Sequence, residues 1–214
     1  FRMGPMTVLL LDDRWPSLIP LEAHGRLGGP VEFTEEVPVR VRWNFQDLVA
    51  AQGPGVLVST NEADPRVRSR VRAGEPLIVA ESRREPVHQA VRAMTRACSM
   101  GEWEAAQTHR SLLPYLAEEA QEFADQVVAW EQDGDERALL GELGDVLLQV
   151  LFHAEIAARR GAFDFQAVAE SFVDKLRSRS PYLFDGSTGV VPAQEQERLW
   201  AKGKARERQI PPGR

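Results

Sequence analysis

The chain has 214 residues, a hydrophobic fraction of 43% and a formal net charge of -6 at pH 7. This length is ample for one or two domains with a buried core. The excess of acidic residues argues against general binding to nucleic acid, which depends on neutralising phosphates with Lys and Arg. No apolar run approaches the roughly 18 residues that span a membrane. The single cysteine, Cys98, excludes a disulfide within the chain and favours a reducing cytoplasm.

Residues 1–86 are predicted to form a small α/β region. Apolar or β-branched runs bounded by Gly, Pro and charged residues are candidate strands at Thr7–Leu11, Pro30–Phe33, Val39–Trp43, Gly55–Thr60 and Pro76–Ser82. Helix-like stretches lie between some of these runs, at Phe45–Ala51 and Pro65–Ala73. Such alternation is typical of a layered α/β region. The region contains no Gly-rich phosphate-binding loop, so its function is not readable from the sequence.

Residues 87–214 are predicted to form an all-α domain of four to five helices. The predicted helices cover residues 87–100, 111–131, 136–160, 164–180 and a last segment from Pro192. Ser111 and Asp164 are candidate N-caps, and Pro114 suits a first helical turn. Gly161 suits a helix end. The predicted fold class is therefore mostly α, with a small α/β region in front of a helical bundle.

The second and third predicted helices carry acidic residues and almost no basic ones. Residues 111–136 contain no Lys or Arg, and neither do residues 138–158. The acids that cluster within about one turn are Glu118, Glu119 and Glu122 on the first of these helices and Glu142 and Asp145 on the next. Like charges at this spacing repel each other, so ordinary solvated helices intersperse Glu with Lys. The pattern indicates that something other than a basic side chain neutralises these acids.

The third predicted helix is apolar on nearly all sides, with Leu143 and Val150 on one face and Phe152 and Ile156 on the other. A helix of this kind is usually buried. Burying an unpaired charge costs several kcal/mol, so acids on such a helix must be paired or bind a metal. A set of carboxylate oxygens suits a hard cation, Mg²⁺ or Mn²⁺. The motif at Glu118 taken alone favours a solvated surface, whereas the acids of both helices together favour a metal site.

The sequence EEAQE at Glu118–Glu122, followed by ELGD at Glu142–Asp145, resembles the EExxE…ExxD signature of the MazG nucleotide pyrophosphohydrolases. The resemblance extends over Trp103–Arg206, and the α/β region resembles, more loosely, the leader of actinobacterial members. It implies an all-α fold whose helices pair into bundles across a dimer. By this resemblance the metal ligands are Glu119, Glu122, Glu142 and Asp145. Glu118 would assist them.

The resemblance also implies the reaction, which is magnesium-dependent hydrolysis of a nucleoside triphosphate to the monophosphate and pyrophosphate. Glu118 or Glu119 would act as the general base on the attacking water. The role implied is the sanitising of non-standard or damaged nucleotides. The residues that would hold the nucleotide are Lys175, Arg179, Trp200 and Lys204, with Trp103 as a second aromatic candidate for stacking on the base. Some members have a lysine where this chain has Ala138, so that phosphate contact is either missing here or made by Arg137.

Two other functions compete with this interpretation. A di-iron carboxylate bundle needs two Glu-x-x-His motifs, but the residues three before His109 and His153 are Ala106 and Val150. A non-enzymatic helical interaction module would explain the apolar helices by dimerisation, yet it leaves the acids without partners. Metal-dependent release of pyrophosphate would separate such a module from the enzyme.

Four further expectations concern the helices. The apolar third helix predicts a homodimer or a larger even assembly, because large exposed apolar patches normally mark interfaces. His109 and His153 are expected to be structural, as a hydrogen-bonding residue and a packing residue. Lys175 and Arg179 lie one turn apart and, without the resemblance, could equally be solvated surface. Gly203 is expected to weaken the last helix by about 1 kcal/mol and to make it mobile.

Overall fold

The computed structural model describes residues 6–209, and its contacts divide the chain into two units between Ala90 and Val91, within helix α3 (Pro86–Met100). The first unit contains a four-stranded parallel sheet in the order β2-β3-β1-β4. Its strands are β1 (Thr7–Leu10), β2 (Val31–Phe33), β3 (Val56–Ser59) and β4 (Leu77–Val79). Four of the five predicted strands are therefore present.

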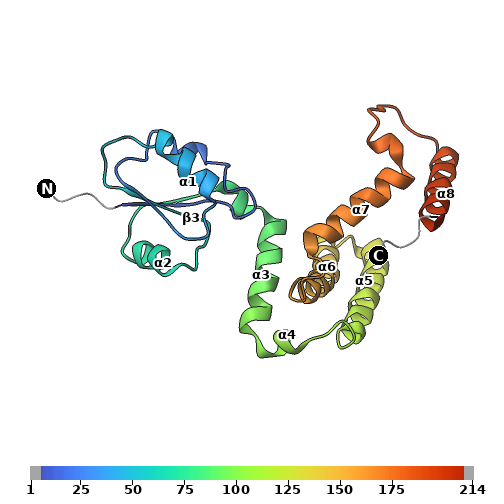
Figure 1. Cartoon of the computed structure of the whole chain (residues 1–214). Coiled ribbons are helices and arrows are strands. Elements are labelled where there is room, and N and C mark those ends of the chain that lie inside the picture. The colour runs from blue at the N-terminus through green and yellow to red at the C-terminus, as the bar shows by residue number, and fades with distance from the viewer. Residues whose placement is uncertain (1–5, 210–214) are drawn as a thin grey trace. The chain divides into compact units, whose positions relative to one another are not determined.

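Both faces of this sheet are covered, as is usual when all strands are parallel. Helices α1 (Val39–Phe45) and α2 (Pro65–Arg72) lie on opposite sides of it (Figure 1). Successive side chains of a strand point to opposite faces. Leu9 of β1 accordingly belongs to the larger core with Phe45 of α1, whereas Val8 packs with Val67 of α2.

The prediction of a strand at Val39–Trp43 is wrong, because these residues form most of α1. The buried side chains Val37, Val41 and Phe45 recur every four residues, which places them on one helical face toward the sheet. Arg42 supports this turn, because its guanidinium donates hydrogen bonds to three backbone carbonyls between residues 34 and 37. The helix predicted over residues 45–51 is reduced to a short 3₁₀ turn, Gln46–Leu48.

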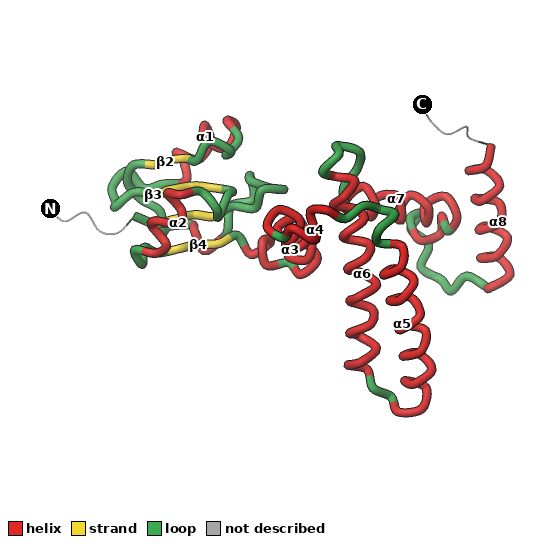
Figure 2. The backbone as a smooth tube through the Cα atoms, turned by 90° about the horizontal axis from the view of Figure 1, so that it is seen from below, coloured by secondary structure: helices red, strands yellow, loops and turns green. Residues whose placement is uncertain are grey.

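The second unit is all-α within the described residues. After α3 it contains α4 (Glu102–Ala106), α5 (Leu113–Asp133), α6 (Glu136–Ala158), α7 (Phe165–Arg179) and α8 (Ala193–Gln209). The predicted fold class, a helical domain after a small α/β region, is thus confirmed. The four to five predicted helices become six between residues 86 and 209, because the short α4 was not expected. Helices α5 and α6 form a long antiparallel hairpin (Figure 2).

The helix ends follow the local sequence closely, with one exception. Asp135 caps α6 by accepting hydrogen bonds from two backbone N–H groups, and Asp164 caps α7 in the same way from one. Gly134, with a φ of 69°, makes the tight turn between α5 and α6. Ser111 does not cap α5, because its hydroxyl accepts the N–H of Thr108 in the preceding loop. In residues 6–209, no helix is long and apolar enough to cross a membrane.

Helix α6 is apolar nearly all round, and the chain itself covers only part of it. Phe152 and Ile156 are buried within the chain itself, so they do not depend on a second chain for their cover. Of the five apolar side chains of α6 that remain exposed at 37–70%, Leu148 stands apart, and the other four follow a spacing of three, four and three residues: Leu140, Leu143, Leu147 and Val150. These four residues are called the α6 stripe below.

Candidate active site

The α5–α6 hairpin brings three carboxylates together. Glu142 and Asp145 lie three residues apart on α6, which places them on neighbouring positions of one face. Glu119 reaches them from α5. Each of the three offers a ligand oxygen, and these oxygens all lie within 4.8 Å of one another. The spacing is compatible with a single divalent cation held between the two helices.

The other two acids of the signature lie beside this group. Glu118 and Glu122 are exposed, and neither carboxylate belongs to the trio of Glu119, Glu142 and Asp145. Their charges nevertheless act on it. The pKa of Glu119 is raised, first by burial and then by the negative charges of Asp145, Glu122, Glu118 and Glu142. The cluster therefore concentrates negative charge that a cation would neutralise.

The environment of Glu142 carries the strongest sign of a missing positive charge. Its Oε2 atom is buried and has no hydrogen-bond partner among the residues that the structure describes. Among the described residues, no Lys, Arg or His forms an ion pair with any of the five acids. Burial is less complete than the sequence suggested, since Glu119 and Glu142 are half-buried and Asp145 is exposed. This fits Mg²⁺, which uses few carboxylates and keeps several waters.

Two histidines form a fixed pair near the base of the hairpin. The Nδ1 atoms of His109 and His153 lie 2.8 Å apart, and their rings stack with an interplanar angle of 4°. A guanidinium only donates hydrogen bonds. Arg160 Nη2, 3.0 Å from His109 Nε2, therefore makes that nitrogen an acceptor. His109 then donates from Nδ1 to His153, and the pair ties the segment before α5 to α6.

Trp103 lies on α4 and packs against the hairpin. Its ring makes edge-on contacts with Tyr115 of α5 and Phe152 of α6, with centroid separations of 5.8 and 6.0 Å. About half of its surface, 51%, stays exposed. Edge-on aromatic pairs of this kind stabilise packing, so the residue helps to hold α4 on α5 and α6.

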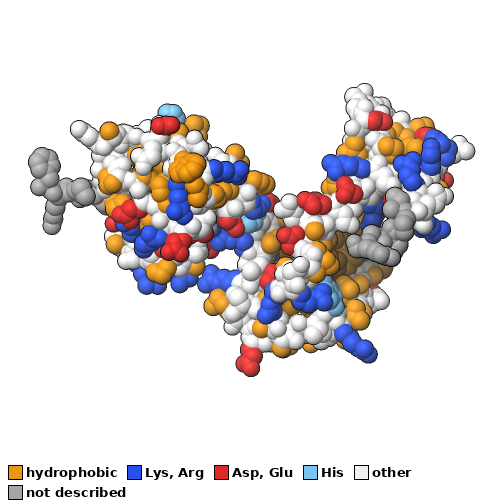
Figure 3. Space-filling view, viewed as in Figure 1, with side chains coloured by type: hydrophobic (Ala, Val, Ile, Leu, Met, Phe, Trp, Pro, Cys, Tyr) orange, Lys and Arg blue, Asp and Glu red, His pale blue; other side chains and the backbone are white. Residues whose placement is uncertain are grey.

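The residues implied for nucleotide binding lie on α7 and α8, which pack against each other. Lys175 and Lys204 are exposed. The Arg179 guanidinium lies over the ring of Trp200, 5.0 Å from its centroid, and forms a salt bridge with Glu207. This ion pair raises the pKa of Arg179 and lowers that of Glu207. Lys and Arg side chains gather over these two helices (Figure 3).

Glu207 is a residue of this cluster that sequence reasoning missed. It lies seven residues after Trp200, so the two share a face of α8. That spacing was the only feature of the sequence that could have placed Glu207 beside Trp200. The structure gives Gly203, which was expected to weaken the last helix, a role in packing. Gly203 is buried inside α8, and a Cβ atom there would lie 2.6 Å from the carbonyl oxygen of Ser178. Glycine thus allows α8 to approach α7 closely.

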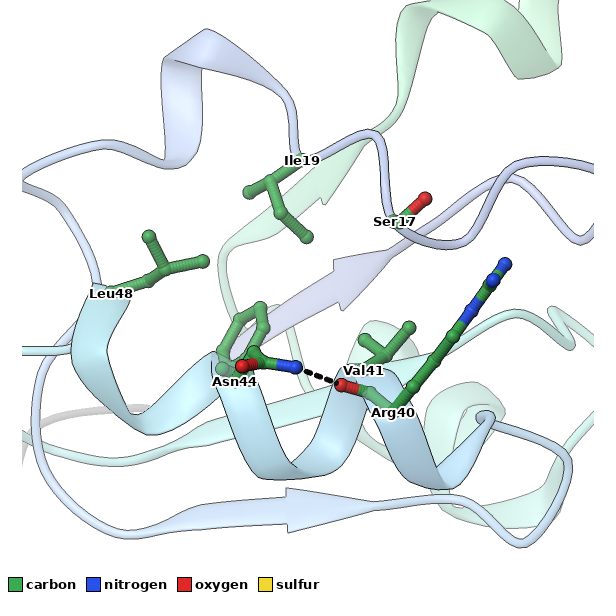
Figure 4. Close-up of a pocket in the computed structure, with 7 residues that line it drawn as sticks. Ser17, Ile19, Arg40, Val41, Asn44 and Leu48 are labelled. Carbon is green, nitrogen blue, oxygen red and sulfur yellow. Dashed lines mark hydrogen bonds between the residues drawn. The ribbon is translucent and has the colours of Figure 1, made fainter.

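A separate pocket of about 230 Å³ lies in the N-terminal unit (Figure 4). Ile19, Val41 and Leu48 contribute apolar walls, and the Asn44 amide donates a hydrogen bond to the carbonyl of Arg40. No carboxylate lines it. The pocket therefore lacks the chemistry of the acidic cluster.

Comparison with known proteins identifies two domains in the chain. The MazG N-terminal domain matches residues 6–78, and the MazG nucleotide pyrophosphohydrolase domain matches residues 107–184. A mazG-related protein of known structure from Thermotoga maritima is 26% identical, with a TM-score of 0.47, and covers 55% of this chain and 97% of its own.

Two relatives match almost the whole chain. A protein of Mycolicibacterium smegmatis is 39% identical over 96% of the chain, and one of Mycobacterium tuberculosis is 39% identical over 95%. Both are named nucleoside triphosphate pyrophosphohydrolase, and the chain spans 64% and 63% of their lengths. The two matching domains and these relatives show that the chain belongs to the MazG family.

Proposed function

We propose that this protein hydrolyses nucleoside triphosphates to the monophosphate and pyrophosphate, with Mg²⁺ as the cofactor and Mn²⁺ as a substitute. The observation that carries the proposal is the buried, unpaired Oε2 of Glu142 inside a group of three carboxylates. The family and the names of the mycobacterial relatives support the same activity. Sanitising of non-standard or damaged nucleotides is the cellular role we infer. The single cysteine, buried and free, supports a reducing cytoplasm as the location.

Glu119, Glu142 and Asp145 would hold the metal, and Glu122 would complete the set from the next turn of α5. The bound metal would lower the pKa of a water and neutralise charge on the phosphates. Glu118 is exposed and outside the trio, so it is the carboxylate available to take the proton of the water that attacks the α-phosphorus. The raised pKa of Glu119 makes it the second candidate for this role.

The nucleotide would be held by the α7–α8 pair. Lys175 and Lys204 would bind phosphate oxygens as mobile cations, and Arg179 would do so from a fixed position. Trp200, 40% exposed, would stack on the base. Trp103 remains a second stacking candidate through its exposed half. Stacking tolerates any base, so the preferred nucleotide is not defined by these residues.

We also propose that the protein is a homodimer or a larger even assembly. The α6 stripe supports this, because its spacing of three and four residues is the pattern by which helices pack side by side. A second copy presenting the same stripe is the commonest cover for such a surface. Within one chain, α8 has its main packing contacts with α7 rather than with α5 or α6. An assembly would allow α7 and α8 of one chain to approach the acids of its partner.

The decisive experiment measures pyrophosphate release from a panel of ribo- and deoxynucleoside triphosphates, with EDTA, Mg²⁺ or Mn²⁺. We expect no release in EDTA and full recovery with either metal, while the circular dichroism spectrum stays unchanged because the hydrophobic hairpin holds the fold. Glu131→Gln is the matched control, since this exposed acid lies on α5 outside the cluster. Undiminished release without metal would contradict the mechanism. An absence of release from every nucleotide would favour the interaction module.

A further inference from the structure

One arginine of α7 is held by three successive turns of α8. Arg179 Nε lies 3.1 Å from Glu207 Oε1, and Arg179 Nη2 lies 2.6 Å from Glu207 Oε2. On its other side, the guanidinium covers one face of Trp200. Gly203 lies between these two contacts, and a Cβ atom there would be 2.8 Å from the Cα of Arg179. The side chain of Arg179 is only 16% exposed as a result.

This arrangement leaves two binding surfaces open. Glu207 takes the Nε–Nη2 edge of the guanidinium, and Arg179 Nη1 donates no hydrogen bond among the described residues. The free edge can still bind an anionic oxygen. The Trp200 side chain keeps 40% of its surface exposed, so its ring can still accept a flat partner. A nucleotide carries both groups, an anionic phosphate chain and an aromatic base.

We propose that Glu207 is a positioning residue for nucleotide binding, which holds Arg179 against Trp200 so that the pair is assembled before the nucleotide arrives. This inference rests on the proposed function. An unrestrained arginine has many rotamers, and ordering it on binding weakens affinity. A carboxylate that fixes one edge of the guanidinium removes that penalty in advance. The alternative, in which Glu207 competes with phosphate, is disfavoured because Nη1 is left open.

The test is Glu207→Ala, with Glu197→Ala as the matched control. Glu197 is an exposed acid of the same helix and makes no hydrogen bond or salt bridge with any residue between 6 and 209, so its loss removes the same charge without touching Arg179. We expect Glu207→Ala to raise KM, and the Kd of a non-hydrolysable α,β-methylene nucleoside triphosphate, about tenfold. The value of kcat at saturation should change less than about twofold. The control should leave KM and Kd unchanged.

Two further measurements separate positioning from a general charge effect. Inorganic tripolyphosphate has no base, and Arg179 keeps its charge in Glu207→Ala. The substitution should therefore raise the inhibition constant of tripolyphosphate less than that of a nucleotide. In a Trp200→Ala background, Glu207→Ala should raise Kd by less than about twofold, because Glu207 acts through the contact between Arg179 and Trp200. If alanine at this position prevents folding, Glu207→Gln keeps the side-chain size and carries the same test.

An unchanged Kd and KM in a folded Glu207 variant would overturn the inference, and a lower KM would show that Glu207 competes with phosphate instead. Both outcomes leave an active wild-type enzyme. A wild-type protein that releases no pyrophosphate would instead contradict the proposed function. The analogue-binding measurement would then still decide whether Glu207 positions a nucleotide site.

Discussion

Replacing Glu142 by glutamine should change stability in opposite directions with and without metal. In metal-free protein the Glu142 carboxylate lies among like charges with a buried, unpaired oxygen. Glutamine has nearly the same shape, removes one negative charge and supplies an amide that can donate to Glu119 or Asp145. We therefore expect Glu142→Gln to stabilise the metal-free protein and to remove most of the stabilisation that metal provides.

The size of the effect follows from the geometry. Two unit charges at 4.8 Å, the upper limit of the distances among these oxygens, repel by about 0.9 kcal/mol in bulk water and by about 3.5 kcal/mol at an effective dielectric constant of about 20. Because this cluster is partly exposed, the gain should lie near the lower figure, about 1 kcal/mol, or about 2–4 °C in Tm. In wild type, Mg²⁺ at about 100 times its Kd should add about 2.7 kcal/mol. The variant should lose most of this increment.

Thermal unfolding followed by circular dichroism, in EDTA and in excess Mg²⁺, measures both effects on the same samples. The variant should melt above wild type in EDTA and below it in Mg²⁺. Glu131→Gln, which removes an exposed acid outside the cluster, should follow wild type in both buffers. A Glu142→Gln protein that melts lower in EDTA and gains as much from Mg²⁺ as wild type would refute the reasoning.

Three other predictions use the same protein. Glu122→Gln and Asp145→Asn should each reduce pyrophosphate release by about 100-fold without loss of fold, because each removes a proposed ligand charge; near wild-type turnover in either would remove that residue from the ligand set. Burial and His109 lower the pKa of His153 below the usual value of about 6.5. As the pH falls, the unfolded chain therefore binds a proton at this histidine before the folded protein does. The contribution of His153 to the free energy of unfolding is present above about pH 6.5 and is lost as the pH falls below it. Between pH 7.5 and 5.5 the Tm of His153→Phe should fall less than that of wild type, and an equal fall in both proteins would contradict this. Leu143→Glu with Leu147→Glu should abolish assembly, and light scattering should then give the 23.9 kDa of one chain; a wild-type protein of that mass would show that no dimer forms.

The sequence by itself determined the features that depend on spacing within one helix or on local caps. Glu142 and Asp145 are three residues apart, and this alone places them on one face of a helix. The absence of Lys and Arg from residues 111–136 and 138–158 predicted acids without basic partners. Among the described residues, Oε2 of Glu142 is indeed unpaired. Asp135 and Asp164 begin their helices through contacts that span only two or three residues. Such contacts form wherever the chain is helical.

Tertiary structure decided what depends on partners distant in the chain. The run Val39–Trp43 has the composition of a strand, but burial of Val41 and Phe45 against the sheet makes it a helix. Glu119 reaches the α6 acids while Glu122 stays outside the trio, because rotation of α5 against α6 selects one turn over the next.

The same reason explains the residues of α6 and α8. Phe152 is buried and Leu143 exposed, although both are apolar and lie on one helix, because the rest of the chain covers only one side of it. Glu207 meets Arg179 across 28 residues of sequence, where Gly203 permits two helices to touch. Periodicity specifies which residues of a helix share a face, but only the packing of other elements specifies what that face meets.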